Sequence, residues 1–317
     1  MLSYQQVLAA QDRSKLYLRP TPCKRLAWLD DYVAGCVYGK LEFFQRSGSF
    51  KFRGALHALL RLEAGTRLRG VVTASAGNHG LGLAESALEL KVQATIFVPE
   101  TVSPLKLQKL QGLGVRLIVN GADYDEAEWA AQEYAQQHNM KFIHAFDDDD
   151  VIAGQGTLGA ELLSESLDLG AVIVPVGGGG LLSGTSLVMK SLRPEIRIIG
   201  VQSEASPAMW AALKKGEVVE TPIAETVADG LAGRYVTAKT LSFAQKLCDA
   251  FVLVRESSIR HAMREIYSRF GWRVEGSAAV GLAAILEGKI HAAGKDCVTI
   301  LSGGNIAPAT FQQQTAA

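Results

Sequence analysis

A run of four glycines, Gly177–Gly180, is the first feature of the sequence that predicts chemistry. The run follows the apolar segment Val174–Val176 and precedes Leu181–Leu192, which is compatible with a helix. Without Cβ atoms, such a loop can turn its backbone N–H groups toward an anion at a helix N-terminus. A simple turn needs only one or two glycines. Neither a Walker Gly-Lys-Ser/Thr nor a G-x-G-x-x-G with a ribose-binding acid is present, so the loop predicts a phosphorylated cofactor.

The segment Ser47–Ala55 places a lysine in a glycine-flanked turn. Ser49 is expected to cap a helix that begins at Lys51, which sets the ammonium near the positive end of the helix dipole. That position lowers the pKa of the amine and suits a lysine acting as a neutral nucleophile or base. The alternative is a solvated surface lysine beside Arg53.

The segment Thr73–Gly80 again follows an apolar run. Its backbone N–H groups, the Ser75 hydroxyl and the Asn78 amide predict a small anion site suited to a carboxylate. Asn78 could also hydrogen-bond a ring oxygen, or merely cap a helix. Hydrolysis by Ser75 and His79 is disfavoured, because no G-x-S-x-G elbow and no third partner can be identified.

The segment Ser302–Asn305 follows the apolar run Cys297–Leu301. A serine at the end of a strand can hydrogen-bond a heteroaromatic nitrogen without protonating it. Taken alone, the same four residues are also compatible with an ordinary turn.

The elements that must position these residues alternate between short apolar runs and amphipathic stretches. The runs predict strands at Gly70–Ala74, Ala94–Pro99, Val115–Val119, Lys141–Phe146, Ala171–Val176, Arg197–Gln202, Phe251–Val254 and Cys297–Leu301. The stretches predict helices at Tyr124–His138, Gln155–Ser166, Pro207–Lys215 and Ser257–Phe270. This alternation predicts two parallel sheets covered on both faces, one before and one after the acidic run Asp147–Asp150. We expect the site in the cleft at the carboxyl ends of the strands.

Glycine is over-represented, with 32 residues in the chain. Of these, 15 lie in only 34 positions, within five short segments that the sequence places just after strands. These segments are Ser47–Gly54, Ser75–Gly82, Gly154–Gly159, Gly177–Gly184 and Ser302–Asn305. We therefore expect all five to surround one ligand.

Composition excludes several classes of function. The 317 residues suggest about two domains, and 32 basic against 32 acidic residues argue against a nucleic-acid binder or a polybasic membrane surface. No apolar stretch reaches about 18 residues and no signal-peptide h-region is present, so we expect no membrane association and a soluble, cytoplasmic protein. The four cysteines have no C-x-x-C spacing, which argues against a disulfide framework or a zinc site.

In combination, the motifs resemble those of the fold-type II pyridoxal-phosphate (PLP) enzymes, most closely the serine/threonine dehydratase group that includes serine racemase. The resemblance spans residues 15 to 308 and rests on Ser49-Phe50-Lys51, Ser75–His79, Phe146–Asp148, Ala153–Thr157, Gly177–Leu181, Ala228–Gly230 and Ser302–Asn305. It implies two open parallel-sheet α/β domains of the tryptophan synthase β type, with the cofactor in the cleft between them. The large domain would comprise residues 1–47 plus 149–317 and the small domain residues 48–148, and the enzyme would be a homodimer.

The resemblance also implies a role for each matching residue. Lys51 would form the internal Schiff base, and Phe50 would lie alongside the cofactor ring. Asn78 would contact the phenolic oxygen, and Ser302 would face the pyridine nitrogen. The phosphate would be held by Gly177, Gly178, Gly179, Gly180 and Leu181, and the substrate carboxylate would be bound by Ser75, Ala76, Gly77, Asn78 and His79. A serine at the nitrogen should leave the ring unprotonated and a weaker electron sink. The resemblance therefore favours β-elimination of water from a 3-hydroxy amino acid such as L-threonine or L-serine, which gives a 2-oxo acid and ammonia.

Two departures from the group sharpen this expectation. Racemases of the group carry a second serine where this chain has Ala76, which cannot accept a proton, so efficient racemisation is not expected. The positions of the group's divalent-metal site correspond to Gln202, Ser206 and Ala208, which lack the carboxylates that magnesium prefers. We expect no tight magnesium, while Glu204 or a monovalent ion stays an open alternative.

Other activities remain open on the same fold. They are racemisation, β-replacement, and elimination from bulkier or more polar substrates such as phenylserine or 3-hydroxyaspartate. The motif Glu275–Ala278 is compatible with such substrates. A non-catalytic binding protein is disfavoured by the presence of both Lys51 and Ser302. The chain ends at Ala317, so we do not expect the C-terminal regulatory domain of biosynthetic threonine dehydratases.

Overall fold

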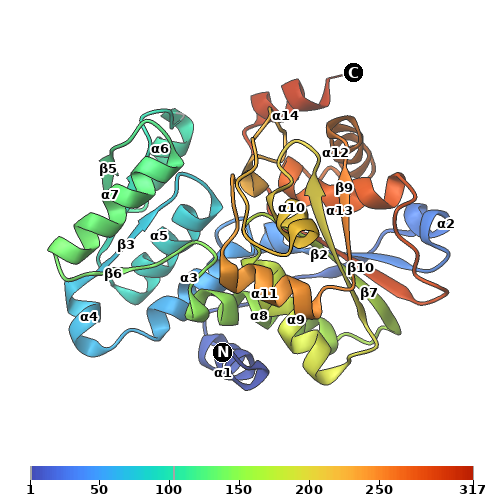
Figure 1. Ribbon diagram of the computed structural model, residues 1–317, viewed down its shortest axis with the longest axis horizontal. Coiled ribbons are helices and arrows are strands. Elements are labelled where there is room, and N and C mark those ends of the chain that lie inside the picture. The colour runs from blue at the N-terminus through green and yellow to red at the C-terminus, as the bar shows by residue number, and fades with distance from the viewer. Residues whose placement is uncertain (1, 103, 317) are drawn as a thin grey trace.

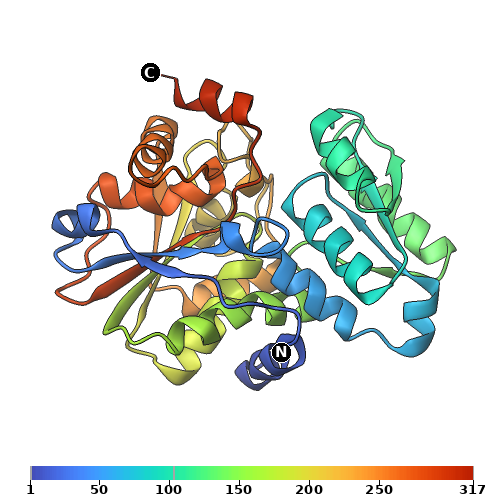
Figure 2. The same ribbon diagram turned by 180° about the vertical axis from the view of Figure 1, so that it is seen from behind.

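The computed structural model describes residues 2–102 and 104–316, which form two α/β lobes side by side (Figures 1 and 2). Each lobe is built on its own sheet, and helix α3 (Lys51–Leu60) lies where the two lobes meet. The prediction of two parallel-sheet α/β domains is confirmed.

The larger lobe contains a six-stranded sheet in the order β1-β2-β10-β7-β8-β9. Its strands are β1 (Cys23–Arg25), β2 (Val37–Leu41), β7 (Leu169–Pro175), β8 (Arg197–Ser203), β9 (Ala250–Val254) and β10 (Asp296–Leu301). All neighbouring strands pair in parallel except the edge strand β1, which is antiparallel to β2. The sequence did not predict β1 and β2, because β1 has three residues and β2 includes a glycine and a lysine.

Helices cover both faces of this sheet, as its continuously buried strands require. Helices α12 (Glu256–Phe270) and α13 (Gly276–Leu286) share one core cluster with the sheet, and α8 (Asp149–Leu163), α9 (Gly180–Leu192), α10 (Ala208–Lys215) and α11 (Ala238–Leu247) share another. The remaining elements are α1 (Tyr4–Ser14), η1 (Ala27–Leu29), α2 (Asp30–Val33), η2 (Glu42–Phe44), η3 (Asp229–Leu231) and α14 (Pro308–Thr315).

The smaller lobe contains a four-stranded, fully parallel sheet in the order β5-β4-β3-β6. The strands are β3 (Val71–Ala74), β4 (Ala94–Val98), β5 (Arg116–Val119) and β6 (Lys141–Phe142), and the helices besides α3 are α4 (Ala64–Arg69), α5 (Asn78–Leu90), α6 (Pro104–Gln111) and α7 (Tyr124–Gln137). Alternate side chains of β3 pack on α7 and on the helices of the opposite face. The predicted strand Lys141–Phe146 was too long, because only its first two residues pair with β3 and the rest crosses toward the larger lobe.

Helix α8 corrects two expectations. It begins at Asp149 rather than Gln155, because Asp148 caps it by accepting hydrogen bonds from the N–H groups of Asp150 and Val151. The predicted helix Gln155–Ser166 therefore began six residues too late, and the acidic run belongs to the helix start.

The glycines of α8 also lie inside the helix rather than after a strand. A Cβ on Gly154 would lie 2.6 Å from the Cα of Gly54 in α3, and a Cβ on Gly156 would lie 2.8 Å from the carbonyl oxygen of Gly184 in α9. These glycines let three helices cross at close range. The segment Gly154–Gly159 therefore serves packing and does not line the site.

Within the described ranges 2–102 and 104–316, no helix is long and apolar enough to span a membrane.

Candidate active site

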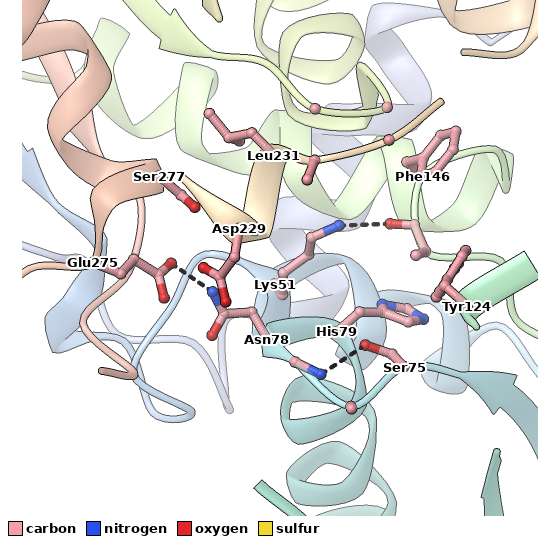
Figure 3. A pocket seen from close by; sticks show the side chains of 18 of the residues that line it. Lys51, Ser75, Asn78, His79, Tyr124, Phe146, Asp229, Leu231, Glu275 and Ser277 are labelled. Carbon is pink, nitrogen blue, oxygen red and sulfur yellow. Dashed lines mark hydrogen bonds between the residues drawn. The ribbon is translucent and has the colours of Figure 1, made fainter. Parts of the chain in front are cut away.

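The predicted site segments meet in one pocket of about 1170 Å³, which residues of both lobes line (Figure 3). The loops follow the carboxyl ends of β3, β7 and β10, as expected for open parallel sheets. All predicted site residues line it, namely Phe50, Lys51, Ser75, Ala76, Gly77, Asn78, His79, Gly177, Gly178, Gly179, Gly180, Leu181 and Ser302. Four of the five glycine-rich segments therefore reach one cavity.

Lys51 is the first residue of α3, and its side chain points into the pocket (Figure 3). The Nζ atom donates a hydrogen bond to the carbonyl oxygen of Ala145 at 2.9 Å. Burial lowers the pKa of Lys51 to about 8, against the field of Glu275, which raises it. Burial therefore favours the neutral amine, the form that can act as a nucleophile or base.

The predicted cap of this helix is wrong. Residue Phe50 occupies the N-cap position, and the buried Ser49 hydroxyl has no hydrogen-bond partner among the described residues. Ser49 instead lies in a bridge to Gly303, which ties the lysine turn to the segment after β10. The predicted direction of the pKa shift at Lys51 is nevertheless confirmed, with burial as its main cause.

The four-glycine loop follows β7 directly and leads into α9, which begins at Gly180. Gly179 has a φ of +95°, a left-handed conformation that favours glycine, and no side chain caps the helix. A Cβ on Gly178 would lie 2.4 Å from the ring of Phe146. The loop thus has the free helix N-terminus that anion binding requires, with no room for side chains.

The loop after β3 leads in the same way into α5, which begins at Asn78 with Gly77 at the N-cap. The Ser75 hydroxyl accepts a hydrogen bond from the Gly77 N–H at 3.2 Å. Burial, followed by the charge of Lys51, lowers the pKa of His79 to about 3, so its imidazole is neutral. The anion-binding capacity of this loop therefore comes from backbone N–H groups and Ser75, without a positive charge from His79.

A chain of side-chain hydrogen bonds orients Asn78. The Asn305 Nδ2 donates to the Asn78 Oδ1 at 2.8 Å. The Asn78 Nδ2 donates to the Glu275 Oε1 at 2.6 Å (Figure 3). Glu275 is 7% exposed, and burial together with the nearby charge of Asp229 raises its pKa to about 7. The amide of Asn78 is thereby held in one orientation at the pocket wall.

Comparison with known proteins agrees with this geometry. The family model "Pyridoxal-phosphate dependent enzyme" matches residues 15–303. This chain is a pyridoxal-phosphate-dependent enzyme. An L-threonine ammonia-lyase of Geobacter sulfurreducens is 38% identical to the enzyme over 306 residues, which cover 96% of this chain and 76% of that protein. Among solved structures, serine racemase from Dictyostelium discoideum is 34% identical with a TM-score of 0.88, covering 96% of this chain and 99% of the other. Processed threonine deaminase isoform 2 from Solanum lycopersicum is 34% identical with a TM-score of 0.91, covering 98% and 92%.

The residues present in the enzyme fit PLP. The glycine loop and the free N-terminus of α9 suit a phosphate, and Lys51 supplies an amine of lowered pKa. The buried hydroxyl of Ser277, which also lines the pocket, has no partner among the described residues and is available to a ligand.

Several residues of the enzyme's pocket were not predicted from the sequence. Glu275 and Asn305 were quoted within motifs without a role, although both orient Asn78. Tyr124, Glu128 and His144 were not singled out, yet they form one polar group on the wall contributed by the smaller lobe. None of these three stands in a glycine-rich turn, so the pattern that located the other segments carried no signal for them.

Proposed function

We propose that this enzyme is an ammonia-lyase that eliminates water from a 3-hydroxy amino acid such as L-threonine or L-serine and releases a 2-oxo acid and ammonia. The observation that carries the proposal is the position of Lys51, whose weakly basic amine enters the same pocket as the glycine loop and the loop after β3. Similarity to the Geobacter sulfurreducens L-threonine ammonia-lyase supports the substrate class.

Each part of the pocket then has a proposed task. When bound, PLP supplies an aldehyde that condenses with an amine and a ring that withdraws electrons from the substrate α-carbon. Gly177–Gly180 and Leu181 would hold its phosphate and Phe50 would lie beside the ring. Asn78 would bind the phenolic oxygen, and Ser302 would face the ring nitrogen. Lys51 would hold the cofactor, and its amine, when free, would accept the α-proton of the substrate.

The loop Ser75–His79 is proposed to orient the substrate by its carboxylate. Ser302 is a neutral group, 2% exposed, and it would leave the nitrogen of a bound ring without a proton. A ring held in this way would be a modest electron sink, which would favour loss of the β-hydroxyl over reactions that keep negative charge on the α-carbon. Elimination is therefore proposed as the main reaction.

A substrate panel with chiral analysis tests this proposal. We expect a 2-oxo acid and ammonia in equal amounts from L-threonine or L-serine, and little D-serine from L-serine, because the methyl group of Ala76 in the pocket cannot deliver a proton. The panel also contains phenylserine and 3-hydroxyaspartate, the larger and more polar candidates. Abundant D-serine would favour a racemase instead, and no 2-oxo acid from any of the four would refute the lyase assignment.

We also propose that catalysis needs no divalent metal. The Gln202 Oε1 accepts the Trp210 N–H at 3.0 Å, and the Ser206 hydroxyl contacts both the N–H and the carbonyl of Gly233, so the side-chain oxygen atoms of both residues already make hydrogen bonds. In the described part of the chain, no three His, Cys, Asp or Glu residues are grouped to hold a metal. We expect EDTA, and magnesium added after it, to change turnover by less than about twofold, whereas a hard-cation site with carboxylate ligands would respond strongly. A large loss with EDTA that magnesium restores would contradict this.

Three broader features belong to the same proposal. We propose domain boundaries at 47/48 and 148/149, a cytoplasmic location, and a homodimer. The two separate sheets support the first, since every strand of the smaller sheet falls between residues 71 and 142. Proteolysis at the two crossings and analytical ultracentrifugation would check the boundaries and the assembly.

A further inference from the structure

The turn Ala145–Asp147 contacts two parts of the site at once. The carbonyl oxygen of Ala145 accepts the hydrogen bond of Lys51 Nζ at 2.9 Å. Phe146 packs against the glycine loop so closely that a Cβ on Gly180 would lie 3.0 Å from its Cα atom. The path of this turn therefore determines both the acceptor for Lys51 and the surface that faces the glycine loop.

His144 holds this turn in place. Its Nδ1 atom accepts hydrogen bonds from the backbone N–H groups of Phe146 at 3.2 Å and Asp147 at 3.0 Å. An acceptor nitrogen carries no proton, so in the neutral ring the proton lies on Nε2.

Glu128 fixes that arrangement from helix α7. Its Oε1 atom lies 3.0 Å from His144 Nε2, in position to accept that proton's hydrogen bond, and Tyr124 hydrogen-bonds the same carboxylate. Burial would raise the pKa of Glu128, but the hydrogen bonds from His144 and Tyr124 outweigh it, so the pKa stays below its usual value and the group remains an acceptor. The side chain of Glu128 is only 12% exposed, which limits competition from water.

We propose that His144 is a positioning residue that, held in one tautomer by Glu128, fixes the Ala145–Asp147 turn and so places Lys51 and the glycine loop for cofactor binding. The inference rests on the proposed role of Lys51. The simpler alternative is that His144 only fills space, because its ring packs edge-on against Phe146 with centroids 4.5 Å apart.

Three substitutions at this position separate the two roles. His144→Asn keeps an acceptor near the Nδ1 site, His144→Gln moves its polar atoms toward the Nε2 site, and His144→Phe keeps only the ring. We expect the PLP-free His144→Asn protein to bind PLP within about threefold of the unchanged enzyme, and the Gln and Phe variants to bind about tenfold or more weakly. Fluorescence titration with PLP measures the dissociation constants, and circular dichroism checks that each variant is folded.

The proton affinity of Lys51 gives a readout that simple packing would not move. The Ala145 carbonyl stabilises the ammonium form, and Glu275 is the charged group whose field also raises the pKa of Lys51. In the Gln and Phe variants, the pH midpoint for modification of Lys51 by trinitrobenzenesulfonate should fall below that of the unchanged enzyme, whereas His144→Asn should keep it. Lys51→Ala supplies the background reaction of the other lysines.

Glu128 provides an independent pair of variants. Glu128→Gln retains an oxygen that can accept from Nε2, and Glu128→Leu does not, so only the leucine variant should weaken PLP binding and lower the Lys51 midpoint. In the holoenzyme, the weakened variants should regain part of kcat at saturating PLP with KM for the amino acid nearly unchanged, since the turn is proposed to act on cofactor and lysine.

Two outcomes would overturn the inference. One is equal PLP binding and equal Lys51 midpoints in the Asn and Gln variants; the other is a His144→Phe protein that matches the unchanged enzyme. Failure of the proposed lyase reaction is distinguishable, because the binding constants and the Lys51 midpoints are measured without turnover.

Discussion

Replacing Lys51 with alanine is expected to reduce the release of 2-oxo acid by at least about 10⁴-fold, the upper end of what a single acid–base group contributes. The amine enters the pocket with its pKa lowered to about 8, so it can serve as nucleophile and as base. Alanine removes both capacities together. The assay follows 2-oxo acid from L-threonine and L-serine, with the visible absorption of bound PLP as a second signal.

Two further variants make the result specific. Lys51→Arg keeps a positive charge but offers no amine to the cofactor, so it should be as inactive as Lys51→Ala. Lys24→Ala changes an exposed lysine of β1 and should leave turnover unchanged. Because burial disfavours the Lys51 ammonium, the Lys51→Ala substitution should not lower the melting temperature of the PLP-free protein. A Lys51→Ala enzyme that kept a tenth of its activity would exclude the lysine from the mechanism.

The parts of this site that the sequence could predict are local. A glycine-rich loop can be recognised from about eight consecutive residues, and strand–helix alternation places each loop at the carboxyl end of a strand. Lys51, the 75–79 loop, Gly177–Gly180 and Ser302 were located in this way, and the structure brings them to one pocket.

The parts that it could not predict join distant segments. Asn78 and Glu275 are separated by 197 positions, and neither residue signals the other in a single sequence. Glu128 and His144 are close in sequence but lie on α7 and on the crossing after β6, and the sequence analysis had assigned that crossing to a strand. Local propensity could not anticipate that strand β6 ends after two residues.

Glycine enrichment had two causes that composition could not separate. In the loop after β7 the glycines open a helix N-terminus to the pocket, whereas in α8 they allow helices to cross. Both uses need the absence of Cβ, and only the three-dimensional contacts tell them apart.

A buried ionic network beneath the site was also missed, and its disruption gives the second large expected effect. Arg53, two residues after Lys51, bonds both oxygens of Glu42 at 2.8 Å and Glu161 at 2.8 Å. Lys40, with no exposed surface, lies 2.6 Å from the other oxygen of Glu161. A third, partly exposed carboxylate, Glu165, lies 3.5 Å from Lys40 at the edge of this network. The network ties α3, which carries Lys51, to β2 and α8 of the larger lobe.

Glu42→Ala is therefore expected to lower the free energy of unfolding by about 3–5 kcal/mol, the loss usually seen when one partner of a buried ion pair is removed. Arg53 would keep its charge without its two-oxygen partner, and the Thr21 hydroxyl would lose its acceptor. Urea unfolding of the PLP-free protein measures the change. The matched control is Glu195→Ala, which breaks the exposed ion pair with Arg193. It should lower the free energy of unfolding by no more than about 1 kcal/mol.

The pH dependence of Glu42→Gln separates charge from packing. Burial would raise the pKa of Glu42, but the charge and hydrogen bonds of Arg53 outweigh it and hold the pKa below the usual value near 4.3. A carboxylate with a lowered pKa stabilises the fold above its unfolded pKa and loses that contribution as the pH falls through its folded value. The stability advantage of the unchanged enzyme over Glu42→Gln should thus be constant above about pH 5 and shrink in more acidic solution. An advantage that did not vary with pH would mean that shape, rather than the ionic network, anchors the helix carrying Lys51.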